Sequence, residues 1–165
     1  YRLARVLAFR DPFATEVVLN AGYQLSNSLI SIGQGGWLGV GLGNSFQKSF
    51  FLPEAHTDFI FAILVEELGI IGGLILILLF VVLFLGLISI MHESFLKARF
   101  FQGYVVFGIF MLTAIQMLFN IAVNIGLLPT KGLTLPFISY GGTSIIIMLS
   151  LMGIVLRINN ENKSL

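Results

Sequence analysis

Two carboxylates and an imidazole stand within residues 53–58, PEAHTD, directly before a long apolar stretch. Glu54, His56 and Asp58 are of the residue types that accept and donate protons in general acid–base catalysis. The apolar residues after Asp58 disfavour its charge, whereas a helix N-terminus would favour it. Two interpretations remain open on spacing alone. Asp58 is a general base, with Glu54 and His56 helping to bind a hydroxylated or anionic substrate, or the carboxylates cap a helix.

The local sequence predicts a helix that begins within residues 53–58. Pro53 suits a first turn, and Thr57 is of a type that often caps a helix N-terminus, so we expect Asp58 in the first turn. His56 and Asp58 could share a metal ion, but a third ligand would have to come from elsewhere in the fold. The sequence therefore assigns no metal ligands, and a divalent cation stays open.

Glu66 and Glu67 repeat the question deeper in the apolar stretch. They follow Asp58 by about 12 to 14 Å along a helix, and adjacent residues on a helix point about 100° apart. Glu66 is nearer to the face of Asp58, so we expect it to line a polar cavity and contact substrate, with Glu67 paired to a basic residue. Structural ion pairs within the helix bundle are the alternative for both.

Three amides recur four residues apart in a later apolar stretch, at Gln116, Asn120 and Asn124. This spacing places them in one stripe on a helix, where lipid exposure would be costly. Amide stripes of this kind more often join helices than bind substrate. We therefore expect the stripe to hold segments together.

The stretch after these amides, LLPTKGLTLPFISYGGTS, carries two prolines and three glycines and is predicted to be irregular backbone. Irregular backbone near a membrane is tolerated where it is buried in protein or lines a wet cavity. Lys131 could meet a pyrophosphate as a point charge, or its ammonium could simply extend to the membrane interface.

The composition is that of a membrane protein. Of the 165 residues, 57% are hydrophobic and 10% are charged, and the mean hydropathy is +0.98. The net charge of +1 gives no indication of a nucleic-acid partner, and the lack of cysteine excludes disulfides and thiolate chemistry. The chain begins without Met and without the apolar core of a signal peptide, so we expect a fragment.

The apolar stretches predict an all-α, polytopic membrane protein with transmembrane helices at 58–90, 103–127 and 141–157. Residues 1–57 are predicted to form a large outer loop with a short amphipathic helix at 22–31. Six glycines follow within residues 33–43, which indicates a flexible external loop, with Trp37 as an interface anchor. The spacing of these glycines does not fit a dinucleotide-binding motif.

Basic residues predict the orientation of the chain in the membrane. The short segments 91–102 and 158–165 hold Lys97, Arg99, Arg157 and Lys163, whereas the 128–140 loop holds only Lys131. Because basic short loops stay in the cytoplasm, we expect 91–102 and 158–165 inside, and 1–57 and 128–140 outside.

The stretches LPEAHTDFIFAILVEELG and LLPTKGLTLPFISYGGTS together resemble the SEDS family (shape, elongation, division and sporulation). These bacterial membrane glycosyltransferases polymerise lipid II into the glycan strands of peptidoglycan. LGNSFQKSFFLPEAHTD and PTKGLTLP are more similar to the division branch than to the rod-elongation branch. A full member has about ten spans, so the resemblance implies the C-terminal portion of such a bundle.

The resemblance implies a catalytic role for Asp58, at the outer face of the bacterial cytoplasmic membrane. There it would deprotonate the attacking sugar hydroxyl or position a cation near the pyrophosphate. The substrate-binding residues that match the motifs are Glu54, His56, Thr57, Lys131, Ser139, Tyr140, Gly141 and Gly142.

The implied partners are lipid II, a cognate class B penicillin-binding protein and the septal division machinery. A lipid II flippase, a non-catalytic scaffold for division proteins and an elongation-type polymerase are the alternative functions.

Overall fold

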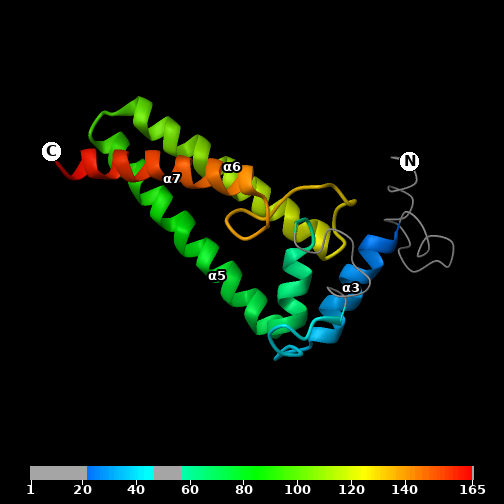
Figure 1. Cartoon of the computed structure of the whole chain (residues 1–165). Helices are drawn as coiled ribbons and strands as arrows, with labels where there is room; N and C mark the ends of the chain where they lie inside the picture. The colour runs from blue at the N-terminus through cyan, green and yellow to red at the C-terminus, as the bar shows by residue number, and fades with distance from the viewer. Residues whose placement is uncertain (1–21, 47–56, 165) are drawn as a thin grey trace.

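The computed structural model describes residues 22–46 and 57–164 of the chain. These residues contain the helices α3 (Tyr23–Gly35), α5 (Ile60–Leu96), α6 (Phe100–Asn124) and α7 (Gly142–Lys163), shown in Figure 1. Within the described ranges no strand is present, and α5, α6 and α7 are each long and apolar enough to span a membrane. The predicted fold class, an all-α membrane protein with three spans in this region, is confirmed.

α5 and α7 extend further at their C-terminal ends than the apolar stretches predict, whereas α6 begins and ends three residues earlier than the predicted 103–127. α5 continues to Leu96 instead of Ile90, and α7 continues to Lys163, so most of the predicted segments 91–102 and 158–165 is helical. Only residues 97–99 separate α5 from α6. Polar side chains support these extra turns, because Glu93 pairs with Lys97 at 3.1 Å one helical turn away.

A break at Gly69 divides α5 into a short limb, residues 60–68, and a long limb, residues 70–96. Gly69 has φ 74° and ψ −178°, a backbone conformation that only glycine adopts readily. The two limbs form a V, and α3 packs against α5 beside the short limb (Figure 1). The single helix predicted over 58–90 is therefore two helical segments with different directions.

The segment of residues 36–43, which we call the docking loop, supplies hydrogen bonds that the broken helix lacks. The amides of Val40 and Gly41 donate to the carbonyls of Glu66 and Glu67 at 2.9 and 3.0 Å. In return, the amide of Ile70 donates to the carbonyl of Gly36 at 2.9 Å. Such replacement partners are what a helix break requires in an apolar environment.

The docking loop lies too close to the helix for side chains at two of its contact points. A Cβ on Gly39 would lie 2.2 Å from the Glu67 carbonyl oxygen, and a Cβ on Gly69 would lie 2.2 Å from that of Trp37. The expected flexibility of this loop is therefore wrong, because the loop is packed and hydrogen-bonded against α5. Gly39 permits the close backbone contact, and Gly36, Gly39, Gly41 and Gly43 all have positive φ, which glycine adopts readily.

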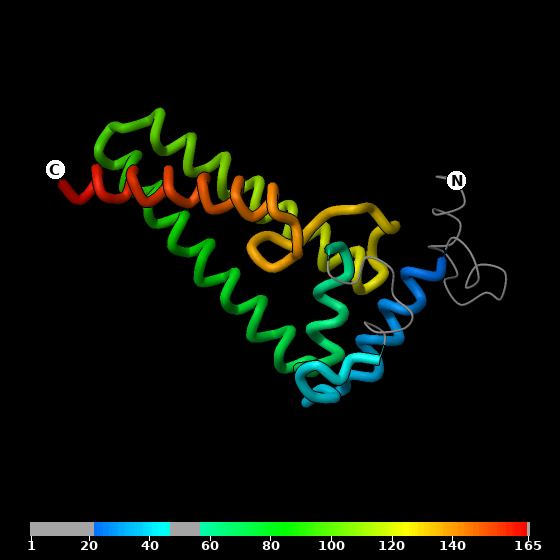
Figure 2. Tube along the Cα trace, in the orientation of Figure 1, coloured from blue at the N-terminus to red at the C-terminus, as the bar shows by residue number. Residues whose placement is uncertain are grey.

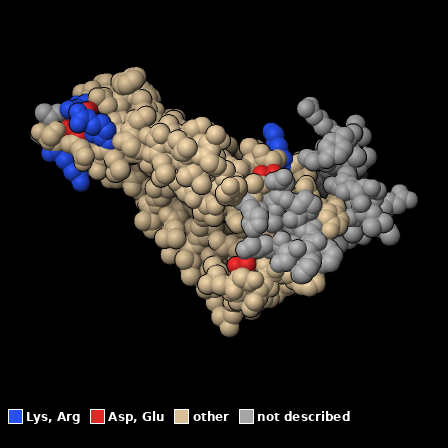
Figure 3. All heavy atoms as spheres, in the orientation of Figure 1, with Lys and Arg blue, Asp and Glu red and all other residues tan. Residues whose placement is uncertain are grey.

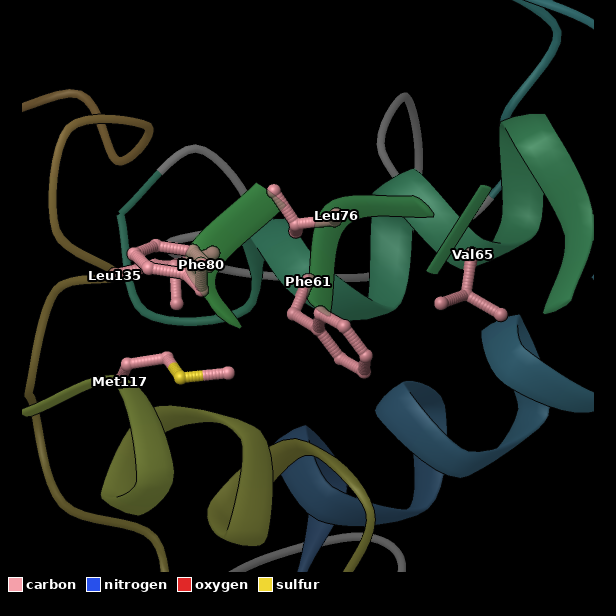
Figure 4. Close-up of a cluster of buried hydrophobic side chains, with 6 residues drawn as sticks. All are labelled: Phe61, Val65, Leu76, Phe80, Met117 and Leu135. Carbon is pink, nitrogen blue, oxygen red and sulfur yellow. The ribbon is translucent and has the colours of Figure 1, made fainter. Parts of the chain in front are cut away.

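A buried apolar cluster joins both limbs of α5 to the rest of the bundle (Figure 4). It takes two side chains from the short limb, two from the long limb, one from α6 and one from the connection between α6 and α7. These are Phe61, Val65, Leu76, Phe80, Met117 and Leu135. The α6–α7 connection crosses close to the start of α5 in the chain trace, because Leu135 is anchored in this cluster (Figure 2).

Candidate functional site

Asp58 lies in a turn directly before α5, and not inside the helix. The N-cap residue is Phe59, which makes no side-chain capping bond, and the first turn contains no acidic residue. The predictions that Thr57 caps the helix and that Asp58 lies in its first turn are therefore wrong. The chain enters the helix two residues later than predicted, and amides of α6 bind the main chain of the preceding turn.

Two of the three striped amides hold the Asp58 turn. The side-chain nitrogens of Asn120 and Asn124 both donate to the main-chain oxygen of Asp58, at 2.9 and 3.0 Å. The Asn124 side-chain oxygen accepts the amide of Ala62 at 3.1 Å, one turn into α5. Asn120 and Asn124 are both buried, so these bonds are made away from solvent.

The same stripe also binds the connection between α6 and α7. Asn120 donates to the carbonyl of Leu133 at 2.6 Å, and Gln116 donates to the carbonyl of Thr134 at 2.9 Å. The expectation that the amide stripe joins segments is confirmed. Thr134 and Ser144, whose hydroxyls lie 3.3 Å apart, extend the network to α7, and the sequence analysis missed both. The amide stripe is the sequence signal from which such polar partners could have been predicted.

Ser139 connects the α6–α7 connection to the Asp58 turn directly. Its hydroxyl donates to the carbonyl of Thr57 at 2.6 Å and accepts the amide of Leu135 at 2.6 Å. Between them, Phe137 has φ 65°, a left-handed conformation that costs about 1–3 kcal/mol for most non-glycine residues. Both partners of the Ser139 hydroxyl are main-chain groups, so this residue fixes the local backbone.

The carboxylate of Asp58 lies beside Gly132, the residue after Lys131. A Cβ built on Gly132 would lie 3.0 Å from Oδ2 of Asp58. Asp58 is partly exposed and Lys131 is exposed, and no carboxylate among the described residues pairs with Lys131. The structure thus brings Asp58, the Lys131–Gly132 segment and Ser139 into one junction, which we call the Asp58 junction.

The other predicted site residues lie at different places. Tyr140 is 78% exposed, and Gly141 and Gly142 form the start of α7, on the same connection as Lys131. Glu54 and His56 lie outside the described residues. Among the described residues, no group of three or more His, Asp or Glu side chains could hold a metal ion.

Glu66 is placed away from the Asp58 junction. It is 1% exposed, and its carboxylate accepts the hydroxyl of Ser45 at 2.6 Å and the amide of Phe46 at 3.0 Å. The polar partners of Glu66 are thus protein groups, where we expected a substrate-filled cavity. Its contacts fix Ser45 and Phe46, which follow the docking loop, onto α5.

An apolar groove of about 170 Å³ lies between the two limbs of α5. It is lined by Ile32, Phe61, Val65, Ile70, Gly73, Leu74, Ile77 and Ile125. This lining offers no polar side chain that could bind or activate a sugar.

Basic side chains gather at the opposite end of the bundle, near the C-terminus (Figure 3). Arg99 and Arg157 both approach the carboxylate of Glu161, at 3.7 and 2.8 Å. Lys97 pairs with Glu93 and also donates to the main-chain oxygen of Asn162. We call this the basic end.

Comparisons with known proteins identify a family and several relatives. The model of the FTSW_RODA_SPOVE family, described as "Cell cycle protein", matches residues 1–164. A "Probable peptidoglycan glycosyltransferase FtsW" from Saccharophagus degradans is 55% identical over 161 residues, which cover 98% of this chain and 41% of the relative. One of the same name from Marinomonas mediterranea is 51% identical over 163 residues, or 99% of this chain and 40% of the relative.

A solved structure has a similar fold. It is described as "Structural coordination of polymerization and crosslinking by a peptidoglycan synthase complex", and one of its chains superposes with a TM-score of 0.72 at 28% identity. The match covers 96% of this chain and 41% of that chain. The chain therefore spans about two fifths of the length of the proteins that it matches.

Proposed function

Because this chain belongs to the FTSW_RODA_SPOVE cell cycle protein family, we propose that it is part of a division-type peptidoglycan glycosyltransferase. The whole protein polymerises lipid II at the outer face of the cytoplasmic membrane, and Asp58 is its catalytic carboxylate. The observation that carries this proposal is the Asp58 carboxylate beside Gly132, next to the exposed Lys131. A base and a cation at one membrane-proximal junction suit attack by a hydroxyl on a pyrophosphate-linked sugar.

In the proposed reaction, the Asp58 carboxylate takes the proton from the 4-hydroxyl of a lipid II sugar. The oxygen then forms a bond to the anomeric carbon of the growing strand, and the bond from that carbon to the pyrophosphate oxygen breaks. Undecaprenyl pyrophosphate leaves with the electron pair, and the proton remains on Asp58 until solvent removes it. Lys131 supplies a positive charge close to the leaving pyrophosphate.

The contacts around Asp58 support a catalytic role for its carboxylate, because the bonds from α6 are made to its main chain. The bonds from Asn120 and Asn124 reach the main-chain oxygen of Asp58, so they position the turn and leave proton transfer to the side chain. We assign Asn120, Asn124 and Ser139 to positioning. Tyr140, Gly141 and Gly142 remain proposed substrate contacts, because they share the connection that carries Lys131.

The names of the relatives support the division branch over an elongation-type polymerase. The matching solved structure concerns a complex that couples polymerization to crosslinking. We therefore include a crosslinking partner, a class B penicillin-binding protein, in the proposal, together with the septal division machinery. A lipid II flippase is the alternative, and it is less well supported because Glu66 binds Ser45 and Phe46 and does not line a path.

The test is Asp58→Asn in the full-length protein, with lipid II polymerisation as the readout. We expect a loss of at least about 100-fold, because the amide cannot accept the hydroxyl proton. Glu93→Gln is the matched control, since it makes the same change in an exposed carboxylate at the basic end. A purified Asp58→Asn protein that polymerised at the normal rate would show the catalytic assignment to be wrong.

Transport is measured separately, with labelled lipid II in proteoliposomes. If the parent protein moved lipid II but did not polymerise it, and Asp58→Asn abolished the movement, the flippase would replace the proposed function.

A further inference from the structure

The docking loop exposes large apolar side chains. Trp37 is 71% exposed, Leu38 is 80% exposed and Leu42 is 76% exposed, all within residues 36–43. Single exposed apolar residues are common on protein surfaces, but a contiguous apolar patch usually marks a contact with lipid or protein. The question is which of these the loop contacts.

Charge is absent throughout this part of the chain. Residues 22–46 contain no Asp, Glu, Lys, Arg or His. A loop in contact with water has no physical reason to avoid charge over so long a stretch, whereas a segment in hydrocarbon has, because a charged side chain there costs about 2.5–3.5 kcal/mol or more.

The backbone at the base of the docking loop meets the second requirement of a hydrocarbon environment, which is that polar main-chain groups have hydrogen-bond partners. The amides of Val40 and Gly41 donate to α5, that of Gly39 donates to Gly35, and the carbonyls of Gly36 and Trp37 accept from Ile70 and Ile71. An unsatisfied polar group would cost several kcal/mol in lipid, which is why irregular backbone is rare there. This loop is irregular, yet α5 satisfies the backbone groups at its base.

The apolar patch continues onto the long limb of α5. Ile70 and Ile71, which donate to the loop, are 38% and 43% exposed, and Leu74 and Ile75 in the next turn are 57% and 54% exposed. The long limb contains the strongest candidate span of the described residues. The exposed apolar surface of the long limb is therefore continuous with that of the docking loop, and hydrogen bonds join the two segments directly.

We propose that the docking loop is inserted in the bilayer, in the leaflet on the side of the Asp58 junction. Leu38 and Leu42 lie among the acyl chains, and Trp37 lies near the headgroups, where its indole is favoured. Because the loop is hydrogen-bonded to α5 on both sides of Gly69, its insertion fixes the depth of the kink in the membrane. The short limb begins at Ile60, so the inserted loop also sets the depth of Asp58. This inference does not depend on the proposed glycosyltransferase activity.

Fluorescence quenching in the full-length protein tests the insertion. This chain has no cysteine, so Leu38→Cys and Leu42→Cys can be labelled with an environment-sensitive fluorophore once any cysteines elsewhere in the protein are replaced. The labelled protein is reconstituted in nanodiscs that contain brominated phosphatidylcholine. Leu78→Cys, on the exposed face of α5, is the lipid control, and Ser164→Cys, after the last turn of α7, is the aqueous control.

We expect brominated lipid to quench the labels at Leu38 and Leu42 at least half as strongly as at Leu78. Aqueous iodide should quench them at least five-fold less than the label at Ser164. Strong iodide quenching would place the loop in water and overturn the proposal. Labels that neither quencher reached would be covered by protein, either the preceding spans or a partner, and this result would also overturn it.

Discussion

The two ends of the bundle are held together by different kinds of bond. At the basic end, charged side chains pair with one another, as Glu161 does with Arg99 and Arg157, beside the neutral bond from Asn162 to Ser94. At the Asp58 junction, neutral amides and hydroxyls bind main-chain groups, as Asn120, Asn124 and Ser139 do.

The difference shows that a protein can position a carboxylate-bearing residue through bonds to its main chain, and that these bonds do not pair the carboxylate with a positive charge. An ion pair stabilises the charged form of a carboxylate and makes it a poor base. The bonds from Asn120 and Asn124 fix the position of the Asp58 turn and are made to its main-chain oxygen, not to its carboxylate. At the basic end no carboxylate is proposed to act as a base, and the charged side chains there form ion pairs that join the helices.

After Asp58→Asn, the largest effect that separates the two ends is expected for Asn124→Leu. This change leaves the Ala62 amide and one bond of the Asp58 carbonyl without a partner, at about 1–3 kcal/mol for each buried group. We expect a clear fall in melting temperature and a loss of polymerisation of about 10-fold or more per folded molecule, since the Asp58 turn shifts.

Asn162→Leu is the matched change at the basic end. Asn162 is equally buried, and its side chain donates to the hydroxyl of Ser94 at 2.8 Å. It should lower the melting temperature comparably and leave activity per folded molecule unchanged. If Asn124→Leu and Asn162→Leu lost activity equally, the Asp58 junction would be no more important for catalysis than the basic end.

A smaller effect is expected for Gly132→Ala, which adds a Cβ 3.0 Å from the Asp58 carboxylate. The side chain of Asp58 must move by a few tenths of an ångström, so we expect polymerisation to fall by about 3- to 10-fold with little change in melting temperature. Gly108→Ala in α6, where a Cβ would meet no atom within 4 Å, is the control. If Gly132→Ala polymerised as fast as Gly108→Ala, the close contact between Gly132 and the Asp58 carboxylate would not matter for activity.

The smallest effect is expected for Glu161→Gln at the basic end. Its partners Arg99 and Arg157 have side chains that are 23% and 76% exposed, and exposed ion pairs contribute about 0–1 kcal/mol. Thermal unfolding should shift by no more than about 2–4 °C, and polymerisation should be unchanged. A large loss of activity would mean that the basic end takes part in function.

The sequence predicted the features that depend on local pattern. Long apolar stretches have few alternatives to helices, so the three spans were recognisable, although their ends were displaced by polar turns such as 91–96. The amide stripe followed from the helical period, and its role in joining segments was confirmed by the bonds of Gln116, Asn120 and Asn124.

The sequence could not predict the features that depend on contacts between distant segments. Thr57 is a good capping residue in isolation, but Ser139 and the α6 amides bind the main chain around it and move the helix start to Ile60. Gly69 gives no local sign of a break, because the break depends on hydrogen bonds from residues about thirty positions earlier. For the same reason, the glycines of the docking loop were taken for flexibility.

The kink at Gly69 also bears on how the protein enters the membrane during synthesis. Glu66 and Glu67 belong to the same helix as the apolar run that follows, and acidic side chains oppose insertion when they lie within a spanning segment. Because the chain changes direction after them, the run from Ile70 onward can insert as a charge-free segment while both glutamates stay outside it. Folding of the short limb onto α3 can then follow insertion, so the polar start of α5 imposes no barrier on its biogenesis.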